Sequence, residues 1–128
     1  MTENIKRRIL VVEDKPDLLY LYRFFLEGAG FLVDTAETKD FAIKALRFTI
    51  YDLALVDLQL KDDINHKGGL DVLAAINDLQ DGTVKIVVSG TSRIRDSIAS
   101  HNLEIAKFIL KGDGPPEDVI GPIKKALE

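Results

Sequence analysis

The sequence predicts an α/β fold, in which a doubly wound sheet of five parallel strands carries helices on both faces. Short apolar runs of strand type alternate along the 128-residue chain with longer runs whose apolar residues recur at helical spacing. A regular alternation of strands and helices is typical of a parallel sheet. Some of the strand-type runs are apolar without a break, as strands covered on both faces are.

Five runs are predicted to form the strands. The first and third, residues 9–12 and 53–56, are continuous apolar tetrads, and Asp57 directly follows the third. The remaining strands are predicted over residues 31–33, 84–88 and 106–110. We expect right-handed crossovers between them, with all carboxyl ends at one edge of the sheet.

The first two helices have clear boundaries in the sequence. Pro16 suits a first helical turn, and Gly28 or Gly30 ends the first run. Thr38 is placed to cap the second helix. The residues expected on the inner faces are Leu18, Leu21, Tyr22 and Phe25 in the first helix, and Phe41 or Ala42, Ala45 and Leu46 in the second.

The three later helices are less regular. Ser92 is placed to cap the fourth, whose apolar face is thin, and Pro115 with Pro116 suits the start of the fifth. Their apolar residues are Leu70, Leu73 and Ile76 in the third, Ile94 and Ile98 in the fourth, and Val119 or Ile120, Ile123 and Leu127 in the fifth. Pro122 would remove a hydrogen bond from the fifth helix, so we expect a kink or break there.

The amino-acid composition excludes or disfavours several classes of function. There are 17 basic and 21 acidic residues, and the formal charge of −4 disfavours direct binding to nucleic acid or anionic membranes. The absence of cysteine excludes disulfides and thiolate metal sites. No apolar run approaches the ~20 residues of a membrane helix, and no signal peptide is recognisable. We therefore expect a cytoplasmic protein with a single domain over residues 1–128 and no effector domain in this chain.

Polar side chains follow four of the five predicted strands. They are Glu13 and Asp14 after the first, Asp57 after the third, Ser89 after the fourth and Lys111 after the fifth. Taken singly each is ordinary, because acidic residues and serine commonly begin turns and cap helices. In a doubly wound sheet, however, ligands bind just beyond the carboxyl ends of the strands. The combination therefore predicts a polar site at this edge.

Three carboxylates at one edge of a sheet need positive charge. Two carboxylates about 4 Å apart repel by roughly 4 kcal/mol at an effective dielectric of 20. Lys111 supplies one positive charge, and a divalent cation would supply two. Carboxylate ligands without histidine or cysteine suit Mg²⁺, which keeps several waters and shares its shell with phosphate oxygens. A carboxylate beside Mg²⁺ and an ammonium is suited to attack phosphorus.

Four segments together resemble the receiver domain of two-component response regulators. They read ILVVED from residue 9, DLALVDL from residue 52, IVVSG from residue 86 and FILK from residue 108. The resemblance extends over most of the chain, from about residue 8 to residue 127. It implies a flavodoxin-like sheet with the strand order 2-1-3-4-5.

The resemblance also implies a phosphorylation site. Asp57 would accept a phosphoryl group from a sensor histidine kinase or a histidine phosphotransfer protein. Asp14 and Asp57 would bind Mg²⁺ together with the backbone carbonyl of Gln59, and Glu13 would act on the metal through water. The domain would assist its own phosphorylation and dephosphorylation without being an enzyme.

Further residues would carry the response. Lys111 would pair with the phosphoryl oxygens, Ser89 would donate its hydroxyl to them, and the ring of Phe108 would follow the movement of Ser89. Gln59 and Thr91 would tune the lifetime of the aspartyl phosphate. Together these changes would switch a surface around the fourth helix, fifth strand and fifth helix, where a downstream protein or a second copy would bind.

Two features depart from the pattern of the family. Gly112 follows Lys111 where the family usually has a proline with a cis bond, so we expect either a trans or a compensated cis peptide. The loop after the third strand looks lengthened by residues 61–67, and the glycine pair at 68–69 comes late. We interpret this loop as solvated; the sharper hypothesis is that Asp62 or Asp63 enters the outer shell of the metal, or that the loop contacts the kinase.

Two other classes of function stay open. One is a degenerate receiver that binds proteins independently of phosphorylation, although all five strand-end residues are present. The other is an enzyme on a similar sheet, such as a Mg²⁺-dependent phosphatase or a flavin carrier. The chain lacks glycine-rich phosphate-binding motifs, and Gln59 stands where such a phosphatase would have a second aspartate. Both observations disfavour the enzyme.

Overall fold

The sheet is the central layer of the structure. The computed structural model describes residues 5–58, 68–92, 95, 98 and 102–128. Within these residues five parallel strands pair in the order β2-β1-β3-β4-β5. The strands are β1 (Arg8–Val12), β2 (Leu32–Ala36), β3 (Leu53–Asp57), β4 (Val84–Ser89) and β5 (Lys107–Leu110). The predicted fold class and strand order are confirmed.

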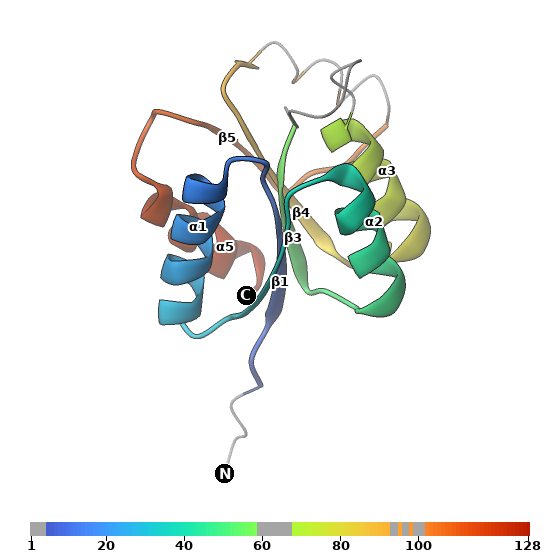
Figure 1. Ribbon diagram of the computed structural model, residues 1–128, viewed down its shortest axis with the longest axis horizontal. Helices are drawn as coiled ribbons and strands as arrows, with labels where there is room; N and C mark the ends of the chain where they lie inside the picture. The colour runs from blue at the N-terminus through green and yellow to red at the C-terminus, as the bar shows by residue number, and fades with distance from the viewer. Residues whose placement is uncertain (1–4, 59–67, 93–94, 96–97, 99–101) are drawn as a thin grey trace.

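Helices cover both faces of the sheet (Figure 1). Helices α1 (Pro16–Gly28) and α5 (Ile120–Ala126) lie against one face, and α2 (Lys39–Phe48) and α3 (Gly68–Leu79) lie against the other. A 3-10 turn, η2 (Pro116–Val119), leads into α5. Among the described residues, no helix is both long enough and apolar enough to span a membrane.

The side chains of β1 alternate between two cores. Ile9 and Val11 belong to the core beneath α1 and α5, whereas Leu10 and Val12 belong to the core beneath α2 and α3. All four are fully buried, because a central parallel strand is covered on both faces. The first polar residues after such a strand therefore stand at the edge of the sheet.

The inner face of α1 agrees only in part with the predicted one. Leu19, Tyr22 and Leu26 are buried, whereas Leu21, which we expected to face inward, is 37% exposed. The helix is apolar around most of its circumference, so periodicity alone does not select the buried stripe. Packing against the sheet selects it.

In α2 the structure selects Ala42 over Phe41 for the inner face. Ala42 and Leu46 are buried, and Phe41 is 62% exposed. The predicted cap is confirmed, because Oγ1 of Thr38 accepts a hydrogen bond from the backbone N–H of Phe41 at 3.1 Å.

Strand β2 extends beyond its predicted end at Val33. It continues through Asp34 and Thr35 to Ala36. Aspartate is depleted in strands, which is why the prediction stopped too early. The hydroxyl of Tyr51 donates a hydrogen bond to Oδ2 of Asp34 at 2.7 Å, so the carboxylate is satisfied within this edge strand.

The C-terminal helix changes type close to Pro122. The 3-10 turn ends at Val119 and the α-helix begins at Ile120. Pro122 consequently lies in the first turn of α5, where its missing N–H has no helical partner to satisfy. The expected break at Pro122 is wrong, because α5 continues through the proline to Ala126, and the change of helix type lies before it.

The predicted fourth helix falls largely on residues that the structure does not describe. Ile94 is one of these residues. Ile98 is described, and it is buried in the core beneath α2 and α3. Its burial agrees with the prediction that Ile98 belongs to the apolar face of this segment.

Candidate functional site

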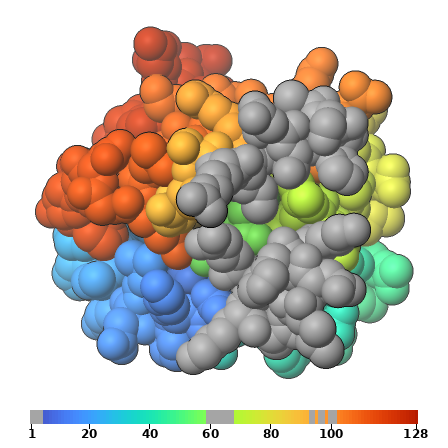
Figure 2. All heavy atoms as spheres, turned by 90° about the horizontal axis from the view of Figure 1, so that it is seen from above, coloured from blue at the N-terminus to red at the C-terminus, as the bar shows by residue number. Residues whose placement is uncertain are grey.

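Three carboxylates meet at the carboxyl ends of β1 and β3. The two strands are neighbours, with Val12 beside Val56, so the residues that follow them reach the same edge. Glu13, Asp14 and Asp57 each place one oxygen within 4.8 Å of the others. Figure 2 looks onto this end of the molecule, where blue, green and orange atoms from distant parts of the chain come together.

The ammonium of Lys111 lies between two of these carboxylates. Its Nζ is 2.8 Å from Oε1 of Glu13 and 2.9 Å from Oδ2 of Asp57. Lys111 follows β5, and its backbone N–H donates to the carbonyl of Ser89 at 2.8 Å. Because β4 separates β5 from β3, roughly 10 Å must be crossed, and the long lysine side chain crosses it.

Burial strengthens the interactions within this cluster. The side chains of Glu13 and Asp57 are 0% and 1% exposed. Burial raises the pKa of Glu13 from 4.5 to about 7; the hydrogen bond with Lys111 opposes this rise, and the charge of Asp57 adds to it. Burial also disfavours the ammonium of Lys111, but its contacts with Glu13 and Asp57 outweigh that effect and raise its pKa. The cluster retains an excess of negative charge.

The donor set fits a hard divalent cation. Every side-chain donor of the group formed by Glu13, Asp14 and Asp57 is a carboxylate oxygen, the ligand type that Mg²⁺ prefers. If all three carboxylates are ionised, Lys111 offsets one of their negative charges, and one divalent cation would balance the other two. Gln59, whose carbonyl we expected to complete the set, lies outside the described residues.

The loop that we predicted to be lengthened also lies outside the residues that the structure describes. Residues 61–67, with Asp62 and Asp63, fall in the range that the structure leaves out. The hypothesis that one of these aspartates enters the outer metal shell therefore stays a prediction.

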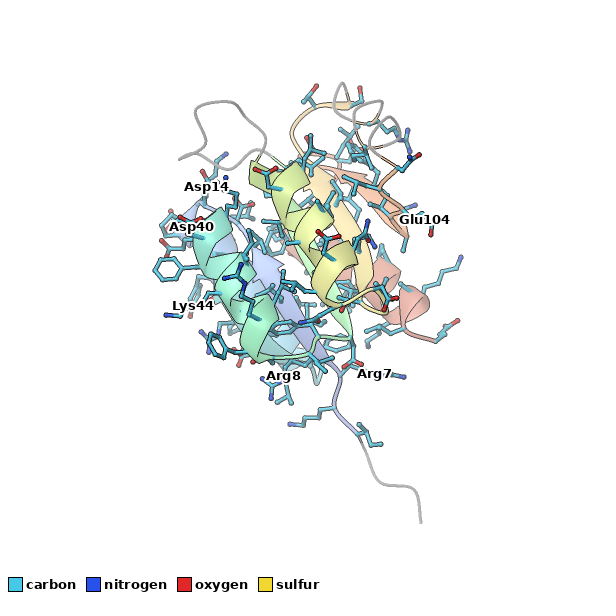
Figure 3. All side chains as sticks on the ribbon, turned by 90° about the vertical axis from the view of Figure 1, so that its right-hand side faces the viewer. Arg7, Arg8, Asp14, Asp40, Lys44 and Glu104 are labelled. Carbon is cyan, nitrogen blue, oxygen red and sulfur yellow. The ribbon has the colours of Figure 1, made fainter. Side chains whose placement is uncertain are left out.

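The opposite end of the sheet carries a different arrangement of charge. Figure 3 shows Asp14 at the end where α2 begins, and Arg7 with Arg8 at the other end. Arg7 lies 3.4 Å from Asp52, and Arg8 lies 3.5 Å from Asp34. Each of these arginines pairs with a carboxylate of its own, whereas at the carboxyl ends of the strands Lys111 contacts two carboxylates.

Gly69, at the start of α3, packs directly against the end of β3. A Cβ at this position would overlap the Cα of Leu58 and would lie 2.8 Å from the carbonyl oxygen of Asp57. Glycine is required here unless the segment that carries Asp57 shifts. In the sequence, the glycine pair at 68–69 is the available signal of this close approach.

At the end of β4, the hydroxyl of Ser89 is engaged with the backbone of Thr91. Ser89 is fully buried. Its Oγ donates to the carbonyl of Thr91 at 3.0 Å and accepts from the N–H of Thr91 at 3.2 Å. The turn that follows β4 therefore holds this hydroxyl.

Phe108 lies beside Val87 in the pairing of β4 with β5 and packs against the core beneath α2 and α3. The guanidinium carbon of Arg95 is 5.2 Å from the centroid of its ring. We did not predict a role for Arg95. An arginine in this polar segment carries no signal of such a contact, because the strand it faces comes later in the chain.

The peptide bond between Lys111 and Gly112 is trans, one of the two forms we expected. Gly112 has a φ of 91°, in the left-handed region that glycine adopts freely. Proline is held near −65°, so it could not occupy this conformation. The chain therefore leaves Lys111 through a conformation that glycine adopts and proline cannot.

The sequence has relatives among regulatory proteins. Residues 9–118 match the family model of the response regulator receiver domain. The alginate biosynthesis transcriptional regulatory protein AlgB of Pseudomonas syringae pv. tomato is 29% identical over 116 residues, and that of Pseudomonas putida is 30% identical over 110. The matches cover 91% and 86% of this chain but 25% and 24% of the relatives, so the chain spans about a quarter of their length.

Solved structures share the fold. A CheY-like response regulator receiver domain protein from Methanospirillum hungatei JF-1 is 29% identical, with a TM-score of 0.84 over 96% of this chain and 94% of that one. Response regulator protein TrrA from Thermotoga maritima, solved in complex with Mg(2+)-BeF, is 26% identical, with a TM-score of 0.77 over 95% of this chain and 99% of that one. Since the family match covers most of its length, this chain belongs to the response regulator receiver domains, the signalling domains of two-component systems.

Proposed function

We propose that this receiver is a phosphorylation switch in which Asp57 accepts a phosphoryl group. The donor would be the phosphohistidine of a sensor histidine kinase or of a histidine phosphotransfer protein. The observation that carries the proposal is the contact of Lys111 with Asp57 at 2.9 Å, inside a group of three carboxylates. In this arrangement the buried carboxylate of Asp57, the proposed nucleophile, lies beside the ammonium of Lys111, which can balance negative charge on a phosphoryl group.

The chemistry is a single displacement at phosphorus. A carboxylate oxygen of Asp57 forms the new P–O bond while the P–N bond to the donor histidine breaks, and the electron pair stays on the imidazole nitrogen. Lys111 already touches Asp57, so its ammonium is placed to offset charge on the transferring oxygens. The phosphoryl group then remains on the chain, which is why we class the domain as a signalling domain and not as an enzyme.

Mg²⁺ is the cofactor that we propose for this step. Asp14, Asp57 and the backbone carbonyl of Gln59 would bind it directly, and Glu13 would act through a water molecule. When bound, the cation neutralises charge that gathers on the phosphoryl oxygens. The all-carboxylate donor group supports this assignment, as does the Mg(2+)-BeF complex of the relative TrrA.

Ser89 and Phe108 would transmit the phosphorylation state. Ser89 would exchange its hydrogen bonds to Thr91 for one to the phosphoryl group, and the neighbouring ring of Phe108 would change position. The surface around the fourth helix, β5 and α5 would respond and bind a downstream protein or a second copy of the chain. Gln59 and Thr91 would tune the lifetime of the aspartyl phosphate. We propose that these events take place in the cytoplasm, without direct contact to nucleic acid or membrane.

The test is incubation with acetyl phosphate and Mg²⁺, followed by mass measurement of the intact chain. Wild type is expected to gain one phosphoryl group, and Asp57→Asn is expected to gain none. Asp81→Asn alters an exposed turn and serves as the matched control, expected to behave as wild type. An unmodified wild type would overturn the proposal and support a receiver that binds partners without phosphorylation.

A further inference from the structure

We propose that Arg95 is a positioning residue that holds the ring of Phe108 in its unphosphorylated position and so opposes the switch. The inference rests on the proposed function, because it concerns the regulation of the same site. The contact between Arg95 and Phe108 takes no part in the phosphorylation chemistry itself.

The ring of Phe108 is held from two sides. On one side it packs against the core beneath α2 and α3. On the other, the guanidinium carbon of Arg95 lies 5.2 Å from the ring centroid. Phe108 is half-buried and Arg95 is exposed, so the arginine covers the ring from the solvent side. A guanidinium within about 6 Å of an aromatic face is attracted by the quadrupole of the ring.

The same stretch of chain links Arg95 to Ser89. Ser89 ends β4, and its hydroxyl exchanges two hydrogen bonds with the backbone of Thr91. Ser89 therefore holds Thr91, and Arg95, which comes later in the chain, contacts β5 through the ring of Phe108. Ser89 must release the carbonyl of Thr91 before its hydroxyl can donate elsewhere, and we infer that this release moves Arg95, which follows Thr91 in the chain. Stacking on Phe108 stabilises the state in which Ser89 and Thr91 remain bonded.

The size of the effect follows from the type of contact. A cation–π contact at an exposed site shifts a two-state equilibrium about two- to fivefold. Where the switched state is the minor one, its population limits the apparent affinity for a ligand that binds only to it. Arg95→Gln is therefore expected to raise the apparent affinity for beryllofluoride, a phosphoryl mimic, about two- to fivefold in the presence of Mg²⁺.

The experiment is a beryllofluoride titration with Mg²⁺, followed through the amide resonance of Ser89. Arg95→Lys keeps a cation over the ring and is expected to restore most of the wild-type affinity. In a Phe108→Leu background, Arg95→Gln is expected to have little effect, because the ring on which the arginine acts is gone. Arg47→Gln removes another exposed arginine, on α2, and is expected to leave the affinity unchanged.

The outcomes separate this inference from the proposed function. Equal affinities of wild type and Arg95→Gln would overturn the inference, and so would a gain that persists undiminished without the ring of Phe108. A wild type that binds no beryllofluoride would overturn the proposed function, and the inference would fall with it. The unliganded domain distinguishes the two cases, because Arg95→Gln should shift the ring resonances of Phe108 whether or not the site accepts a phosphoryl group.

Discussion

Nζ of Lys111 lies 2.8 Å from Oε1 of Glu13, although the two residues stand near opposite ends of the chain. The same ammonium lies 2.9 Å from Asp57. Both carboxylates are buried, so one cation serves two acidic groups that have little access to solvent. This shared contact makes the site sensitive to the loss of a single charge.

Lys111→Met is expected to destabilise the domain when Mg²⁺ is absent. Removal of one partner of a buried ion pair leaves charge without compensation. Because Lys111 is 19% exposed and the carboxyl of Glu13 can take up a proton, we expect a loss of roughly 1–3 kcal/mol in the free energy of unfolding. Urea unfolding at neutral pH with a chelator measures it. Lys39→Met, which breaks a surface pair with Asp71, should cost less than about 1 kcal/mol, and equal losses would contradict the prediction.

Mg²⁺ is expected to stabilise the wild-type domain in proportion to its occupancy. A ligand that binds only the folded state adds about 2.7 kcal/mol to the free energy of unfolding when its concentration is one hundred times the dissociation constant. Thermal unfolding with increasing Mg²⁺ checks this, and chelation should reverse the gain. Asp14→Asn should lose most of it, because one carboxylate of the cluster is removed. Asp81→Asn should keep the full gain; a similar loss in both variants would count against a specific site.

Gly69→Ala is expected to destabilise the domain and to slow labelling by acetyl phosphate. The added Cβ would meet the backbone of Leu58 and the carbonyl of Asp57, so the end of β3 must move. Overpacking of this kind costs roughly 1–3 kcal/mol. At Gly82 a Cβ meets nothing within 4 Å, so Gly82→Ala is the matched control in urea unfolding. Equal urea midpoints for the two variants would contradict the prediction, because the end of β3 would then shift without any loss of stability.

Gly112→Pro is expected to destabilise the domain, although it introduces the residue usual for the family. Gly112 has a φ of 91°, which proline cannot adopt, so we expect a loss of more than about 1 kcal/mol. Gly112→Ala should cost roughly 1–2 kcal/mol, the penalty of a left-handed conformation. Thermal unfolding compares the two. A proline variant as stable as wild type would mean that the loop after Lys111 has a second accessible conformation.

Lys85→Met is expected to stabilise the domain, with a gain that depends on pH. Lys85 is 7% exposed on β4, and burial lowers its pKa while the charge of Glu104 opposes the shift. Below its ordinary pKa of 10.5 the unfolded chain therefore binds more protons at this site, and wild-type stability rises as the pH approaches that value. At neutral pH the substitution should add about 0.5–2 kcal/mol.

Urea unfolding over a range of pH measures this gain, which should shrink toward pH 10.5. Lys107→Met replaces an exposed lysine on β5 and should give no comparable gain. A loss of stability on Lys85→Met would show that the ammonium has a favourable role in the folded state.

The positions of the acidic site residues could be predicted because the central strands are apolar throughout. In β1 and β3 a run of buried residues ends abruptly in Glu13 and Asp57, and parallel pairing brings such ends together. The helix cap formed by Thr38 could also be predicted, since it depends on residues three positions apart in the sequence. These features are local, or follow from one rule of sheet geometry.

Other features depended on which surfaces meet. The apolar circumference of α1 offers several stripes, and only contact with the sheet selects Leu19, Tyr22 and Leu26. The close approach of Gly69 to the end of β3 arises from the path of the chain into α3. Arg95 and Phe108 come from different elements, and no spacing in the sequence indicates their contact.

The sequence by itself determined the alternating strands and helices, and which polar residues stand at the strand ends. Both follow from the periodicity and continuity of apolar residues along the chain. Only the tertiary structure decided that Lys111 would reach Glu13 and Asp57 across β4, and that Arg95 would cover Phe108. The physical reason is that such contacts depend on strand order, register and the reach of long side chains, which are properties of the folded chain.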